Sequence, residues 1–547
     1  MKRQSKAYFT NSHSALLEDL HTLLENEMWL AMPVRADYSV REIKEFQAFL
    51  DISPSRLMRL RETRDIKRNP DMIFGQYDRT ANPFSDPSHR TTDQNTQGAI
   101  AVGLVGFNKA MSGKNDDAVP KELLQEYIDE GDGGEQQPSS SSSDSSSKSC
   151  VNTKHPPMLT STAINILKHL GKYLHMMQIF QPISYQVFHG FTQIFDYYLY
   201  TIYSFFGGLP QHSHGEDKIS FPKLSKRLRT TLRRIREQLL ASNKDVASPQ
   251  VMERASSTAN ILSRTASLHK TNSVAAIRQS KAIRVAPAKL SRAIDIKSKS
   301  TVYGISERSV AIESLMFIVH AVKAVQEHLR RLIAKPHLRA LAKFYNNSVA
   351  CCTDLRQYLY EIVQRMLINL ESIPNRIAKI SWDVQDTGIA QHEYIGLMER
   401  EFTMFSARID DAEKRQLIPH HIGSYIWKLT IHYAMEQMVE GFSNAPKCSD
   451  GGRALMSLDL THVQHTLKRL VNEDIAKDLF DLVQYAASYI KAYYLPAIEI
   501  LPFIQENATR YKKHHLVQLV THASAKLPKK TRQELVKQVG VVLNKKK

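Results

Sequence analysis

The residues of this 547-residue sequence that are best suited to chemistry are its paired histidines. Three pairs stand close together: His420 with His421, His462 with His465, and His514 with His515. Two imidazoles bind a transition metal when a cysteine or a carboxylate completes the ligand set. The sequence places no cysteine and no evident carboxylate partner beside them. We therefore expect surface or half-buried imidazoles and no metal site.

The carboxylates and sequence motifs give no sign of an active site. Asp383 and Asp386 are one helical turn apart, and helix capping explains them without acid-base catalysis. The sequence has no Gly-x-x-x-x-Gly-Lys-Ser/Thr phosphate loop, no strand followed by Gly-x-Gly-x-x-Gly, no Gly-x-Ser-x-Gly elbow and no His-Glu-x-x-His motif. We predict a protein that is not an enzyme and takes no cofactor.

Composition bounds the class of protein. Four cysteines, with Cys351 and Cys352 adjacent, lack metal-ligand spacing, and we expect reduced thiols in an intracellular protein. No stretch reaches the roughly 18 apolar residues of a membrane span, which favours a protein that is soluble or peripheral to a membrane. The formal net charge is +18, and residues 221–300 hold 18 Lys and Arg against 4 acids. Most of the excess charge therefore lies in one segment.

Apolar residues recur at helical spacing along most of the chain, and prolines separate the helices. We predict an N-terminal helical piece at 12–60, a helical bundle at 158–240 and C-terminal helical bundles at 302–535. A disordered Ser-rich linker at 61–157, a basic disordered insertion at 241–301 and a basic tail at 536–547 separate and follow them. The prediction is an all-α fold, an elongated stack of helical bundles with disordered linkers.

Two helical segments carry particular expectations. Residues 187–206 are dense in aromatic side chains, and polar interruptions favour a buried helix over a membrane-inserting one. Residues 381–384 are expected to open a helix. Residues 438–460 are expected to form a hinge, in which Gly441 and Pro446 stop one helix and Ser449 with Asp450 caps the next.

The hinge also carries a family resemblance. Glu-Gly-Phe-Ser-Asn at 440–444, Lys-Cys-Ser at 447–449, Gly-Arg-Ala-Leu-Met at 452–456, Leu-Asp at 458–459 and Tyr-Ile-Lys-Ala-Tyr-Tyr-Leu at 489–495 resemble the C-terminal region of syndetin. The structural signature of the resemblance consists of Glu440, Gly441, Asn444, Cys448, Gly452, Arg453, Met456, Asp459 and Tyr494.

This resemblance implies a subunit of a multisubunit vesicle-tethering complex that acts in endocytic recycling at endosomes. It implies a rod-type helical fold, three partner subunits, SNARE proteins as further partners, and a cytoplasmic protein peripheral on recycling endosomes or trans-Golgi network membranes. The similarity runs from about Leu16 to the C-terminus and leaves out the family's long N-terminal half. We expect either a truncated form or a divergent product.

Two shorter signals suggest further partners. Asn82-Pro83-Phe84 is the tripeptide that EH domains of endocytic adaptors bind, and its alternative is an ordinary turn. The basic segment suits a solvated linker, anionic lipid head groups or nucleic acid, and the scarcity of aromatic residues in it makes nucleic acid unlikely. The residues proposed for lipid contact are Lys226, Arg227, Arg229, Arg233 and Arg234. The alternative function is therefore that of a peripheral anionic-lipid-binding protein.

Overall fold

The computed structural model describes residues 2–50, 156–208, 222–241, 283–384, 392–523 and 528–545. These residues form helices and no named strand, and their extended backbone pairs only in two isolated bridges, Leu240 with Val285 and Trp382 with Cys448. The predicted all-α fold is confirmed. Asn82-Pro83-Phe84, the Ser-rich tract and most of the predicted insertion lie outside the described residues.

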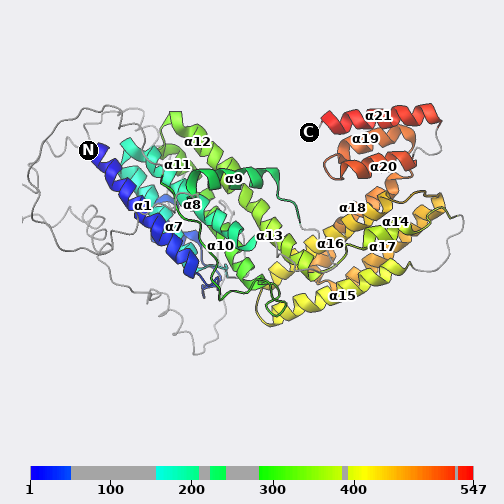
Figure 1. Ribbon diagram of the computed structural model, residues 1–547, viewed down its shortest axis with the longest axis horizontal. Coiled ribbons are helices and arrows are strands. Elements are labelled where there is room, and N and C mark those ends of the chain that lie inside the picture. Colours follow the sequence, from blue (N-terminus) through cyan, green and yellow to red (C-terminus); the bar gives the residue numbers. More distant parts are fainter. Residues whose placement is uncertain are drawn as a thin grey trace, which may run out of the picture. The chain divides into compact units, whose positions relative to one another are not determined.

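The N-terminal part of the described chain is a bundle of long helices that lie side by side (Figure 1). Its members are α1 (Lys2–Asn26), α7 (Ser161–Ile179), α8 (Ser184–Phe206), α10 (Ile305–Ala324) and α13 (Cys351–Leu367). Helix α1 begins ten residues before the predicted limit of 12, because its buried face continues upstream to Phe9. Apolar spacing did not predict these first residues, which are mostly polar.

Helix α8 forms the centre of this bundle. Phe191, Phe195 and Tyr198 are almost fully buried, which confirms the prediction of a buried helix. Trp29, in the chain after α1, is also buried, and its ring centroid lies 5.3 Å from that of Phe206 and 6.2 Å from that of Tyr198. Aromatic rings bury a large area in such contacts. The burial of Trp29 against these rings therefore holds the end of α1 against α8.

Shorter helices complete the bundle. They are α2 (Lys44–Leu50), which packs on α7, α9 (Lys226–Leu239), which packs on α8 and α13, α11 (Gln326–Leu332) and α12 (Leu338–Phe344). Short 3-10 segments at Val40–Glu42, Gln181–Ile183 and Lys335–His337 and a π-helical turn at Tyr345–Val349 connect the helices.

Residues 283–301 differ from the expectation of disorder. Val285 pairs with Leu240, the Lys289 N–H donates to Glu25 at 3.0 Å, and the Ala286 carbonyl accepts from Tyr197 at 3.0 Å. Val285 and Ala288 are buried. This part of the basic segment carries enough apolar side chains to pack along the bundle. The net charge of the segment does not reveal this packing.

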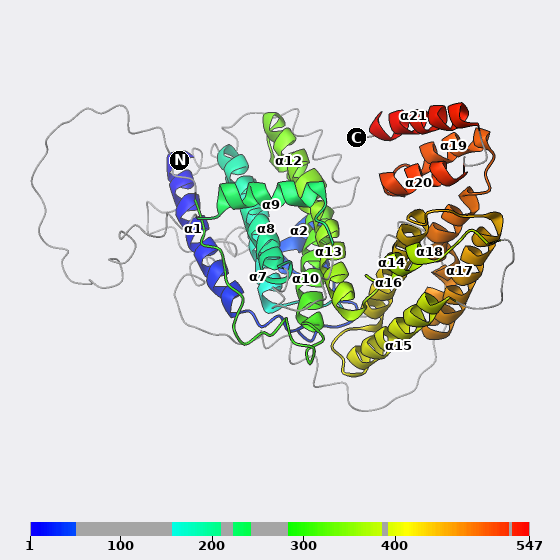
Figure 2. The same cartoon turned by 45° about the vertical axis from the view of Figure 1, so that its right-hand side comes forward.

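The C-terminal part is built around α16 (His420–Ser443), which packs against α13, α14 (Ile373–Lys379) and α18 (Glu473–Ala492). Helices α15 (Glu393–Lys414) and α17 (Asp450–Leu470) pack against each other (Figure 2). The last three helices are α19 (Ala497–Asn507), α20 (Lys513–Ala523) and α21 (Lys529–Lys545), and α20 contacts α16. As predicted, Pro374, Pro419 and Pro496 stand at the starts of helices.

Among the described residues, a single helix with the length and apolar composition of a membrane span is not found. Helices α10 and α11 pass that test only when taken together, and a bend of 53° separates them. Most apolar side chains of α10, including Ile312, Leu315 and Val319, are buried against neighbouring helices.

Candidate functional site

The signature residues gather around Ser449, at the start of α17. The Ser449 side chain accepts from the Gly452 N–H at 3.1 Å and so caps α17, as the sequence predicts. Its backbone N–H donates to the Trp382 carbonyl at 3.0 Å, and its hydroxyl oxygen accepts from the Val384 N–H at 3.1 Å. One residue therefore joins the α16–α17 connection to the chain that follows α14.

Residues 381–384 do not open a helix. Trp382 instead forms an isolated parallel bridge with Cys448 of the signature, and its indole N–H donates to the Ile377 carbonyl at 3.0 Å. The Trp382 side chain is fully buried, and its ring packs edge-on against Phe442. Local sequence suggested a helix start, but pairing with a segment distant in the sequence fixes an extended backbone here.

The two signature glycines permit close packing. A Cβ added at Gly452 would overlap the Trp382 carbonyl, and one at Gly441 would lie 2.6 Å from the Cβ of Ile377. The sequence suggested that Gly441 stops α16, but the helix continues to Ser443. Its role is to let α14 approach α16, so a glycine inside a helix marks a contact here rather than an end.

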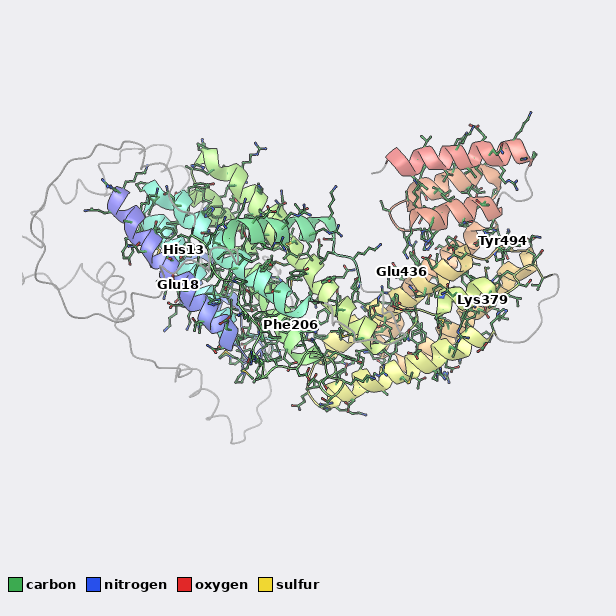
Figure 3. The ribbon with its side chains drawn as sticks, viewed as in Figure 1. His13, Glu18, Phe206, Lys379, Glu436 and Tyr494 are labelled. Atoms are coloured by element: carbon green, nitrogen blue, oxygen red, sulfur yellow. The ribbon has the colours of Figure 1, made fainter. Side chains whose placement is uncertain are left out.

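Arg453 is buried and occupied by local partners. Its Nη1 donates to the Tyr493 carbonyl at 2.9 Å and to Asp450 at 3.2 Å. Its guanidinium also lies 5.2 Å and 5.3 Å from the ring centroids of Tyr493 and Tyr494. Such contacts offset the cost of burying the charge. Arg453 therefore ties the start of α17 to the end of α18, where Tyr494 remains half exposed (Figure 3).

Asp459 is a buried signature residue of α17, and Met456 is buried one turn before it. One Asp459 oxygen accepts from the Tyr394 hydroxyl at 2.7 Å and lies 2.8 Å from Nδ1 of His392. Burial raises the pKa of the Asp459 carboxyl, and the two partners oppose that rise. His392 lines a surface groove of about 640 Å³ with Arg376, Lys379 and Glu393. The pair of Asp459 and His392 fixes the start of α15 against α17.

Glu440 and Asn444 lie at the end of α16, where sequence reasoning missed the partners of Glu440. His514 and His515 each place Nε2 2.9 Å from a different oxygen of the Glu440 carboxylate, and the Lys512 ammonium lies 3.0 Å from one of them. The expectation that these histidines lack a carboxylate partner is wrong. These partners hold the pKa of Glu440 well below its usual range, and the hydrogen bond from His515 contributes most.

Burial lowers the pKa of His515, so its imidazole is neutral and donates to Glu440 as a neutral ring. Asn444 is exposed and contacts the Glu440 carboxylate from the same side of α16, at 3.5 Å. No sequence signal could reveal this group, because 74 positions separate Glu440 from His514. The structure therefore brings a carboxylate and two imidazoles together in the C-terminal domain.

The predicted lipid-contact residues lie on or beside α9 and divide into two sets. Arg227 pairs with Asp354 at 2.5 Å, and Arg234 pairs with the buried Asp196 at 2.9 Å. Lys226, Arg227, Arg229 and Arg233 are exposed, and Arg234 is half-buried. Arg227 and Arg234 thus bind acidic residues of the bundle, although Arg227 is exposed like the other three.

Comparison with known proteins agrees with the resemblance that the signature residues carry. Residues 302–540 match the family model described as Syndetin, C-terminal. Syndetin of Rattus norvegicus and syndetin of Mus musculus are each 31% identical to this chain over 555 residues, which cover 98% of the chain and 53% of each relative. Syndetin of Gallus gallus is 29% identical over 545 residues, 98% of the chain and 54% of the relative.

This chain therefore spans about half the length of the curated relatives it matches. The search of solved structures gives no match. All nine signature residues lie within the matched segment, between Glu440 and Tyr494. Eight of them pack or bond at the contacts of α14, α15, α16, α17 and α18 or with α20. Residues 302–540 of the chain are therefore a syndetin C-terminal domain, and the chain is similar to the curated syndetins over 98% of its length.

Proposed function

We propose that this chain is a non-catalytic subunit of a multisubunit vesicle-tethering complex that acts in endocytic recycling and endosome-to-surface transport. The proposal rests on the syndetin C-terminal domain at residues 302–540 and on the similarity of nearly the whole chain to curated syndetins. The signature groups support it, because Arg453, Asp459 and Glu440 are each held by neighbouring side chains or carbonyls of the fold. They brace helices rather than converge on one reacting atom.

In this proposal, exposed helix faces contact three other complex subunits and SNARE proteins through many modest contacts. Large apolar side chains are exposed in the C-terminal domain, with Phe480 on α18 64% exposed and Ile498 on α19 86% exposed. Side chains of this kind become buried when partners bind. The protein would act on the cytoplasmic face of recycling endosomes and trans-Golgi network membranes.

The test is binding of the purified chain to the purified partner subunits. A double variant, Phe480→Asp with Ile498→Asp, should keep its helical circular dichroism and lose at least about tenfold in affinity, since charge replaces apolar contact. The matched control is Ile179→Asp, which changes a 72% exposed apolar residue at the end of α7. Wild-type affinity for every subunit in the double variant would place the contacts elsewhere.

The second candidate function is binding to an anionic membrane surface through α9. Lys226, Arg229 and Arg233 are exposed on one helix, and each basic residue near such a surface contributes about 1 kcal/mol. Reversing these three charges to Glu should abolish the flotation of the chain with phosphatidylserine vesicles and leave the fold intact. An equal reversal at exposed Arg400, Lys468 and Lys491 is the control.

We also propose Asn82-Pro83-Phe84 as a ligand for an EH domain. The supporting observation is the tripeptide itself, together with the endosomal role proposed above. A peptide that spans these residues should bind an isolated EH domain, and the same peptide with Phe84→Ala should not. Equal binding of both peptides would show that the EH domain does not recognise the Phe84 side chain.

A further inference from the structure

The end of α16 and the first turn of α20 bring three potential metal ligands together. One oxygen of Glu440 lies 2.9 Å from Nε2 of His514, and the other lies 2.9 Å from Nε2 of His515. One ligand atom from each of the three residues falls within 4.8 Å of the others. The three residues come from two helices that meet only in the folded chain.

Two imidazoles and one carboxylate are a ligand set that zinc uses in proteins, with water in the fourth position. A tetrahedral zinc ion with bonds of about 2.1 Å separates its ligand atoms by roughly 3.4 Å. The present spacing therefore needs only small side-chain movements to admit the ion. We propose that Glu440, His514 and His515 form a binding site for a divalent zinc-type cation. This site is independent of the proposed tethering role.

The hydrogen bonds of the three groups suit a metal. A zinc ligand must be an ionised carboxylate or a neutral imidazole. The Glu440 carboxylate accepts from Lys512 and lies 2.9 Å from Nε2 of each imidazole, as an ionised acceptor does. In the empty site each Nε2–H donates to the carboxylate. Binding leaves the ring neutral, with the proton on Nδ1 and the Nε2 lone pair on the ion.

Lys512 supplies the positive charge when no metal is bound. Its ammonium lies 3.0 Å from the Glu440 oxygen that also contacts His515, and its side chain is 48% exposed. An entering dication repels this ammonium, which can move into water because the lysine stem is flexible and exposed. Lys512 therefore competes with the metal and lowers its affinity. Removing this charge should strengthen binding.

A bound ion would join α20 to α16. Helix α20 has no acidic residue in its first turn, so Glu440 of α16 supplies the negative charge that the amino end of a helix favours. The side chain of His515 is fully buried, whereas that of His514 is 48% exposed. The ion would thus lie on the solvent-exposed side of the contact between α16 and α20. There it would hold the C-terminal helices to α16.

The experiment is a titration of the chelator-stripped full chain with Zn²⁺, followed by isothermal calorimetry, and with Co²⁺, followed by visible absorption. Wild-type chain should bind one equivalent at this site and give the absorption bands of four-coordinate cobalt. The variant His514→Gln should lose roughly 10- to 100-fold in affinity, and Lys512→Met should gain several-fold, because a competing cation is removed.

Two further variants keep the result interpretable. Glu440→Gln removes the charge of the carboxylate but keeps its shape, and it should lose affinity as His514→Gln does. The control His432→Gln changes an imidazole beside Glu436 on the exposed side of α16 and should bind like wild type. Absence of Zn²⁺ binding by the wild-type chain, or unchanged binding by His514→Gln, would overturn the proposal.

Discussion

The carbonyl of Trp382 accepts the backbone N–H of Ser449, 3.0 Å away, although the two residues are 67 positions apart in the chain. The same Ser449 caps α17 through Gly452. Ser449 thus connects the start of α17 to the chain between α14 and α15. The signature residues pack closely here, so a larger side chain at Gly452 would destabilise the fold.

Gly452→Ala should destabilise the chain because the new Cβ would occupy the position of the Trp382 carbonyl. Backbone cannot move aside as a flexible side chain can, and we expect the free energy of unfolding to fall by about 2 kcal/mol or more. Urea unfolding followed by circular dichroism measures this change.

The control for that substitution is Gly396→Ala in α15. Its added Cβ meets no heavy atom within 4 Å, and alanine favours a helix over glycine by about 0.5–1 kcal/mol. This variant should unfold at the same or a higher urea concentration. Equal destabilisation by both substitutions would contradict the close approach of Gly452 to Trp382.

Arg453→Met should also destabilise the C-terminal domain. The change leaves the buried Tyr493 carbonyl without its donor and removes the cation from the rings of Tyr493 and Tyr494. Losing one partner of such a buried charged contact costs about 3 kcal/mol. Thermal unfolding measures the change, with Arg400→Met at an exposed position of α15 as the control. A wild-type melting temperature in Arg453→Met would refute the bracing role.

The N-terminal bundle should lose stability as the pH falls from about 6.5 to 4. Burial lowers the pKa of His13 to about 4 and that of His169 to about 4. Both imidazoles are neutral in the folded state, so the unfolded chain binds more protons below pH 6.5, and the stability present above that pH is lost as the pH falls toward 4. Each histidine contributes at most about 3 kcal/mol over this window.

His13→Gln tests this pH dependence. His13 lies on α1, with Nδ1 2.7 Å from the Tyr173 hydroxyl and Nε2 2.8 Å from Gln193 (Figure 3). The variant should flatten the plot of unfolding free energy against pH by about half, since His169 keeps its share. His320→Gln, at an exposed position of α10, should keep the wild-type slope. An unchanged slope in His13→Gln would show that His13 does not contribute.

Sequence reasoning predicted the features that depend on local spacing. The aromatic face of α8 is buried, Ser449 caps α17, and prolines stand at helix starts, because each follows from residue type and near neighbours. The start of α1 was missed because Phe9 is the one buried residue between Lys2 and Asn11, and its ring packs on that of Tyr173. One apolar residue gives no periodicity, and its partner lies far along the chain.

The candidate site could be predicted only in part. The signature residues were recognised by their types and order, but their contacts were not, because Trp382, His392 and His515 come from distant segments. Gly441 was interpreted as a helix end because glycine often ends helices, whereas here it admits Ile377 of α14. Likewise the charge of residues 283–301 predicted disorder, and the packing of Val285 is a tertiary effect.

Quantitative affinity purification of the tagged chain from cells tests whether the chain is a subunit of a tethering complex. We expect mass spectrometry to recover the other subunits of the recycling-endosome complex in a fixed ratio to the bait. Recovery of none of them, under conditions in which a tagged full-length syndetin recovers all, would contradict it.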